Sequence, residues 1–167
     1  EPRRSQGTSQ ASPVVAGAAA LVRQARPAFS PMEVKAALMN STEPLADLAS
    51  QLYQTSIVGS GRVAIERAVA QQITAGADVE AGEVGVAFGA VTSDAPAKVE
   101  RSVTLKNHGT AEVTLDASVI ATHVLPGVSV TVEPKSVKLP AGQSATVKAV
   151  LSLDPAALGS PGPDPGT

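Results

Sequence analysis

The sequence predicts a mixed fold, in which a helical N-terminal part is followed by an all-β, sandwich-like part. Between about residues 9 and 72 the apolar residues recur at helical spacing. After residue 82 the period shortens to two, as in Val113, Leu115 and Ala117, which alternate with polar residues. We therefore expect a helical domain over residues 1–73 and a β-sandwich over 83–153, joined by an Ala- and Gly-rich linker at 74–82.

The composition limits the classes of protein that fit. The 167 residues allow one or two small domains. A net charge of −2 without a basic stripe argues against a nucleic-acid partner. The absence of cysteine excludes disulfides and thiolate metal sites. The longest apolar run, residues 13–22, is shorter than the ~20 residues that span a bilayer, so we expect no transmembrane segment. The aromatic residues are only Phe29, Tyr53 and Phe88.

The apolar run predicts one central helix from about Ser9 to Ala25. Pro13 is expected in its first turn, where a missing N–H costs little, and Pro27 closes the helix. Residues 14–22 are apolar on every side, and such a helix needs burial on all flanks. The ~50 residues that follow supply too little cover, so we expect a large region to precede residue 1.

A second helix is predicted from a capping box. Ser30 is the expected N-cap, with Pro31 at the first helical position and Glu33 at the third. The helix should run to about Asn40 and bury the apolar residues at helical spacing, which are Val34, Ala37 and Leu38.

A short closing helix is predicted after the turn Gly59-Ser60-Gly61-Arg62-Val63. Its apolar stripe consists of Ile65, Ala68, Val69 and Gln72 at positions i, i+3, i+4 and i+7. Two glycines alone make a weak phosphate-loop signal, so a tight turn is the interpretation we keep.

The alternating second half predicts short strands separated by turns, which favours a β-sandwich. Asn107-His108-Gly109-Thr110 has the composition of a turn. The tail, residues 154–167, is rich in Pro and Gly and is either a loop that leads to a further strand or a natural terminus. The sandwich is expected to be incomplete, with at most these strands: 84–88, 101–107, 112–121, 128–133, 136–139 and 144–153.

The stretch Gly7-Thr8-Ser9-Gln10-Ala11-Ser12-Pro13 brings a serine to the start of the apolar helix. Backbone N–H groups there are unpaired and partly positive, so they can hold an oxyanion while the hydroxyl attacks a carbonyl. Three other interpretations compete: an ordinary loop, a signal peptide after Arg3 and Arg4, and a hydrolase nucleophile elbow. Pro13 and Gly17 interrupt a signal peptide, and the elbow requires glycine where Ala11 stands.

This stretch resembles the serine motif of subtilisin-like serine peptidases (subtilases), G-T-S-M-A-[ST]-P-x-V-[AS]-G. Gln10 replaces the usual Met, and the other defined positions from Gly7 to Gly17 agree. Residues 25–40 and 59–63 are also similar to family segments. The resemblance implies that Ser9 is the nucleophile, with its backbone N–H in the oxyanion hole. Residues 1–73 would then be the C-terminal part of an α/β catalytic domain whose Asp, His and oxyanion-hole Asn come earlier.

The resemblance implies a secreted serine endopeptidase that acts on proteins or peptides. His108 and His123 follow Ser9, whereas the family order is Asp, His, Ser; we expect both at turns or strand ends. Because Ser9 lacks a base, we predict that the chain alone is inactive. An order of Ser9, an Asp and His123 along the chain would suit an α/β-hydrolase. The residues around Ser9 do not match the nucleophile elbow of that fold, however, and the alternating pattern of the second half favours a β-sandwich instead.

The β-half is similar to the fibronectin type III-like or immunoglobulin-like modules that follow many subtilase catalytic domains. The alternative function is therefore a non-catalytic extracellular binding or structural protein whose working part is this module. No cofactor is expected, and no metal site is predicted because the ligand spacing is absent. Calcium binding is implied by the family resemblance alone.

Overall fold

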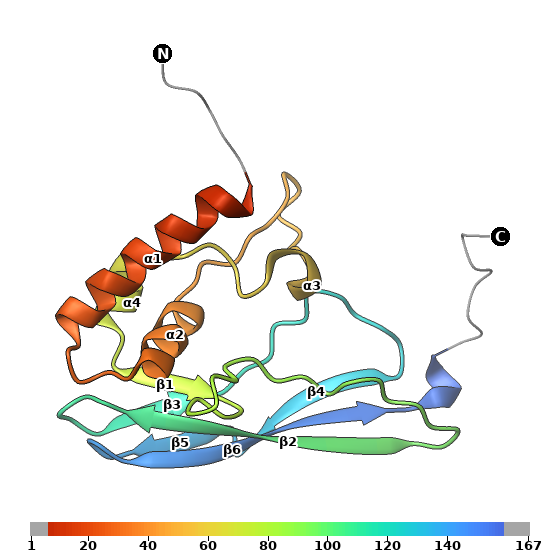
Figure 1. Ribbon diagram of the computed structural model, residues 1–167. Helices are drawn as coiled ribbons and strands as arrows, with labels where there is room; N and C mark the ends of the chain where they lie inside the picture. Colours follow the sequence, from red (N-terminus) through yellow and green to blue (C-terminus); the bar gives the residue numbers. More distant parts are fainter. Residues whose placement is uncertain (1–6, 159–167) are drawn as a thin grey trace.

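The computed structural model describes residues 7–158, which form helices followed by two β-sheets (Figure 1). Residues 1–6 and the end of the predicted tail, 159–167, lie outside the described residues. The elements are α1 (Thr8–Ala25), α2 (Pro31–Asn40), α3 (Thr55–Val58), α4 (Ile65–Ala70), β1 (Ile73–Gly76), β2 (Ala97–Asn107), β3 (Val113–Asp116), β4 (Val128–Glu133), β5 (Ser136–Leu139), β6 (Ser144–Leu153) and the 3-10 helix η1 (Pro155–Ala157). The mixed helix and sheet content confirms the predicted class.

Helix α1 begins at Thr8, one residue earlier than predicted, behind Gly7 at φ 140°. Pro13 consequently lies inside the helix, in its second turn, and the prediction of a first-turn proline was wrong. The missing N–H removes the hydrogen bond to the Ser9 carbonyl four residues earlier. No helix within residues 7–158 is long and apolar enough to cross a bilayer.

The predicted capping box of α2 is present. Ser30 Oγ accepts from the Glu33 N–H at 3.2 Å, and a Glu33 carboxylate oxygen accepts from the Ser30 N–H at 2.8 Å. The predicted apolar stripe of α2 is buried. Together α1, α2 and α4 enclose one hydrophobic core, whose buried members are Ala18, Val22, Phe29, Val34, Ala37, Leu38 and Ala68.

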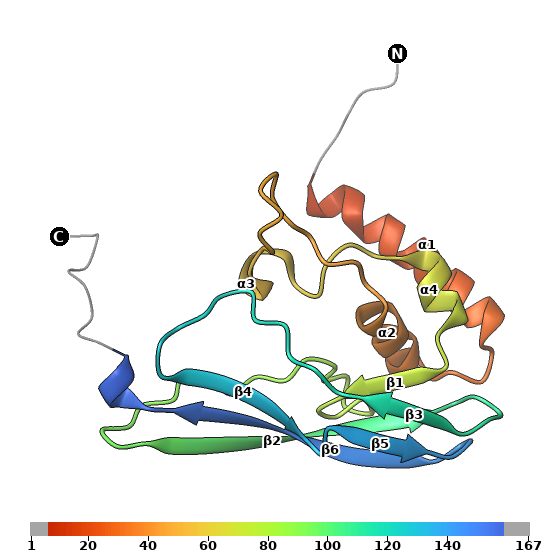
Figure 2. The same cartoon turned by 180° about the vertical axis from the view of Figure 1, so that it is seen from behind.

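The strands form a four-stranded sheet of order β1-β2-β6-β4 and a two-stranded sheet, β3-β5. All pairs are antiparallel. In both views the helices lie on one side of the strands (Figures 1 and 2). The predicted sandwich arrangement and the likeness to fibronectin type III modules both remain predictions.

Three predicted segments differ from the structure. The expected linker at 74–82 starts inside strand β1, whose residues pair with Thr104–Asn107, a segment that follows them only after a long stretch of chain. Residues 84–88 form no strand; instead, the carbonyls of Ala87 and Phe88 accept from the Arg101 guanidinium. The expected strand at 112–121 stops at Asp116. Local alternation could not reveal these outcomes, because distant pairing and side-chain donors decide them.

Candidate functional site

Ser9 lies in the first turn of α1 and is exposed. Its Oγ donates to the side-chain oxygen of Gln10 at 3.1 Å. The Gly7 carbonyl accepts from the N–H groups of Gln10 and Ala11 at 3.1 Å each, which closes the turn. The Ser9 N–H belongs to the first four of the helix, which have no intrahelical acceptor and carry partial positive charge. The hydroxyl and a donor for an oxyanion therefore lie on one residue.

Gly7 gives this turn its shape. At φ 140° a side chain would be strained, and a Cβ there would lie 3.1 Å from Gln10 Oε1. The Gln10 side chain reaches back over the turn, and its Oε1 accepts a hydrogen bond from the Ser9 hydroxyl. Gln10 is also the residue that departs from the family motif. This departure therefore gives the Ser9 hydroxyl a hydrogen-bond acceptor, as well as affecting local packing.

Neither histidine contacts Ser9 in the described part of the chain. His108 follows the end of β2, and its Nε2 lies 2.9 Å from Thr74 Oγ1. Its Nδ1 lies 3.9 Å from Glu33 Oε1. His123 is exposed in the connection between β3 and β4. The location of His108 agrees with the predicted strand-end position, whereas His123 lies in a bend within the long connection; in the described part of the chain neither histidine hydrogen-bonds to Ser9.

Helix α1 is buried on one flank only, although the sequence predicts burial on every side. Among its residues only Ala18 and Val22 are buried, and Val14 is 53% exposed. The reason is that, among the described elements, α1 packs mainly against α2 and α4. Its N-terminal half borders an apolar groove of about 370 Å³, lined by Val14, Val15, Leu38, Met39 and Val63 among others.

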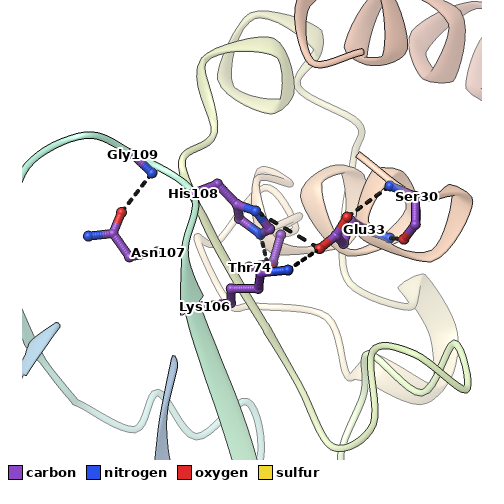
Figure 3. Close-up of polar contacts among 7 residues, drawn as sticks. All are labelled: Ser30, Glu33, Thr74, Lys106, Asn107, His108 and Gly109. Atoms are coloured by element: carbon purple, nitrogen blue, oxygen red, sulfur yellow. Dashed lines mark hydrogen bonds and ion pairs between the residues drawn. The ribbon is translucent and has the colours of Figure 1, made fainter. Parts of the chain in front are cut away.

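A second polar site joins the helices to the sheet. We call it the junction cluster: Ser30, Glu33, Thr74, Lys106, Asn107, His108 and Gly109 (Figure 3). Lys106 Nζ donates to Glu33 Oε1 at 2.7 Å. The Phe29 and His108 rings lie 4.5 Å apart between centroids. The residues come from α2, β1, β2 and the turn after β2, so no spacing in the sequence indicated the cluster.

Opposing effects act on the pKa of Glu33. Burial raises it, but the hydrogen bonds from Lys106 and Ser30 and the charges of Lys106 and His108 outweigh burial and hold the pKa of Glu33 below its ordinary value. For His108, burial lowers the pKa, Glu33 opposes this, and the charges of Lys106 and Arg26 add to the lowering. The net pKa of His108 is below 6.5, which favours the neutral ring.

The hydrogen bonds of the Asn107 side chain agree with the predicted turn after residue 107. They fix the backbone that follows the end of β2. The Asn107 side-chain amide donates to the carbonyls of Ala111 and Leu139, at 2.9 and 3.0 Å. Its Oδ1 accepts from the Gly109 N–H at 2.8 Å. The fully buried polar side chain is thus satisfied, as burial requires. Within residues 7–158, no group of three or more His, Asp or Glu side chains is placed to hold a metal ion.

Comparison with known proteins agrees with the motif. Residues 3–61 match the model of the Subtilase family. Minor extracellular protease Vpr of Bacillus subtilis (strain 168) is 31% identical over 118 residues, which cover 70% of this chain and 15% of Vpr. Subtilisin-like protease SBT1.4 of Arabidopsis thaliana is 42% identical over 76 residues, which cover 38% of this chain and 10% of that protease.

These matches support the subtilase family and, at the level of the family, a serine peptidase. The matched region contains Ser9 and ends at Gly61, in the turn before α4. The chain spans only 15% and 10% of the length of these two relatives.

Proposed function

We propose that this chain is part of a subtilisin-type serine endopeptidase in which Ser9 is the nucleophile. The observation that carries the proposal is an exposed serine in the first turn of α1, inside the region that matches the family. Ser9 is exposed and, within the described residues, its hydroxyl donates only to Gln10, a surface side chain; its own N–H lies at a helix start, where developing negative charge is stabilised.

The proposed reaction is acyl transfer to water. A histidine supplied by the preceding part of the parent protein takes the Ser9 proton, and an aspartate orients that histidine. The Ser9 oxygen bonds to the scissile carbonyl carbon, and the oxyanion is held by the Ser9 N–H and an Asn amide, which the family resemblance also assigns to the preceding part. The amine leaves with the proton, and water then releases the acyl group from Ser9.

The exposed flank of α1 supports the proposed completion of the domain. Val14, Val15 and Leu21 are open to solvent, and apolar helix surface of this kind is normally covered. We infer that the preceding catalytic region covers this flank. Protein or peptide substrates follow from the proposed reaction. An extracellular location follows from the family resemblance and is consistent with the extracellular relative Vpr.

We infer that the 167-residue chain alone does not hydrolyse peptide bonds. The described histidines have other environments: His108 is engaged by Thr74 and Glu33, and His123 is exposed in the connection between β3 and β4. The purified chain should show no peptidase turnover, and measurable turnover abolished by Ser9→Ala would contradict this inference.

A fluorophosphonate probe tests the nucleophile in the complete parent protein. The probe forms a covalent bond with an activated serine oxygen, so we expect labelling at Ser9 and its loss in Ser9→Ala. The matched control is Ser12→Ala, because Ser12 is an exposed serine of the same helix. Labelling that survives Ser9→Ala, or a folded parent that is never labelled, would refute the assignment.

A further inference from the structure

A polar cavity of about 420 Å³ lies beside the junction cluster, on the side of the α1–α2 connection. Its lining comes from parts of the chain far apart in sequence: Ala25–Phe29, Glu33, Lys106–His108 and Gly142. It contains three side chains that are or can become cationic, Arg26, Lys106 and His108, and one carboxylate, Glu33. A cavity with this balance favours a negatively charged occupant.

The one carboxylate in the cavity is already engaged. Glu33 Oε1 accepts from Lys106 Nζ, and Oε2 accepts from the Ser30 N–H. Its charge is therefore largely neutralised by Lys106, which leaves the charge of Arg26 without a matching carboxylate.

Not all N–H donors of the Arg26 guanidinium have an acceptor in the described part of the chain. One terminal nitrogen, Nη2, donates to the Ala70 carbonyl at 3.2 Å. Its Nε is shielded from solvent and has no acceptor in the described part of the chain. Arg26 also forms no ion pair with any residue in 7–158. Because Nε is shielded, the fork that this guanidinium can present to an occupant of the cavity is formed by its two terminal nitrogens, and such a fork suits planar or tetrahedral oxyanions.

We propose that this cavity binds a small oxyanion, carrying a carboxylate or a phosphate group, between Arg26 and His108. The guanidinium supplies forked donors, and the imidazole supplies a further charged donor once it is protonated. Gly142 and Phe29 form part of the wall of the site. The proposal is independent of the chemistry of Ser9, since it concerns the junction between the helices and the sheet.

Binding and protonation of His108 are linked. The charged groups that act on His108 are Glu33, Lys106 and Arg26, and the two cations together with burial keep the ring neutral near pH 7. A bound anion compensates those cations and favours the imidazolium, so it raises the pKa of His108. By reciprocity the anion binds more tightly as the pH falls.

The test follows the histidine ring resonances of the 167-residue chain by NMR during titration with inorganic phosphate and, separately, with acetate at constant ionic strength. We expect a saturable shift of the His108 resonances and a rise of its pKa by roughly half a pH unit or more. The exposed His123 is the internal control and should show neither. A response to phosphate alone identifies a phosphate site, and a response to acetate identifies a carboxylate site.

Arg26→Gln should weaken the anion about tenfold or more, since it removes charge-assisted hydrogen bonds. The matched control is Arg67→Gln, which removes the same charge from an exposed position on α4. If Arg26→Gln does not fold, Arg26→Lys keeps the charge without the fork and should weaken binding by a smaller factor. The proposal is overturned by an absent His108 response to both anions, by equal losses in the two glutamine variants, or by unchanged affinity in Arg26→Lys.

Discussion

The first turn of α1 and the junction cluster differ in how their polar groups are satisfied. Ser9 is exposed and donates only to the adjacent Gln10 within the described residues. Glu33, in the junction cluster, receives hydrogen bonds from Lys106 and Ser30 and lies near His108. The exposed Ser9 hydroxyl thus has the features of a reactive group. The side chains of Glu33, His108 and Asn107 are instead engaged in contacts that hold two parts of the chain together.

The most severe test of this comparison replaces one residue of each site in the complete parent protein and compares the effects on kcat. Ser9→Ala should lower kcat by a factor on the order of 10⁶, the size typical of losing a triad serine. His108→Gln should leave kcat within about threefold, since a group that only holds structure contributes no transition-state contact. Both are measured by steady-state peptide hydrolysis at a temperature where each variant is folded. A large loss of kcat in His108→Gln would remove the distinction between the sites.

A second test concerns the aromatic contact at the junction. Phe29 is 5% exposed and packs beside the His108 ring, so Phe29→Ala should cost about 3–5 kcal/mol of unfolding free energy. Tyr53→Ala is the control, because Tyr53 is 43% exposed and its removal leaves a smaller hole. Urea unfolding followed by circular dichroism measures both. Equal costs would mean that the junction contributes no more than the surface.

The capping box gives a smaller expected effect. Ser30→Ala removes the acceptor for the Glu33 N–H at the start of α2 and should cost about 1 kcal/mol. Ser118→Ala, in an exposed connection, should stay within about 0.5 kcal/mol. The same urea experiment compares them, and a Ser30→Ala variant as stable as Ser118→Ala would show that the cap is dispensable.

The smallest effect we expect is in the pH dependence of stability. His108 has a folded pKa below 6.5, so its contribution is present above pH 6.5 and is lost as the pH falls through the folded pKa. Glu33 has a folded pKa below 4.5, so its contribution is lost at still lower pH. Denaturation midpoints from pH 8 to 5 should fall, and His108→Gln should flatten that decline. An unchanged slope in the variant would contradict the assignment to His108.

The helices were predictable because their signals are local. Ser30, Pro31 and Glu33 identify the start of α2, and its apolar stripe agrees with the observed core. The strands β4, β5 and β6 were also predicted at their observed bounds, because apolar and polar residues alternate and turn residues bracket them. Strand β1 was missed, since four residues without clear alternation become a strand only by pairing with β2.

The amino-acid sequence by itself determined the turn and helix that carry Ser9, because Gly7, the helix start and the motif lie within a dozen adjacent residues. It also determined that the second half is built of strands. Only the tertiary structure decided that Glu33, Thr74 and His108 meet, since they lie on elements far apart in the chain. The physical reason is range: caps, turns and periodicity act over a few residues, whereas burial and ion pairing depend on which surfaces the fold brings together.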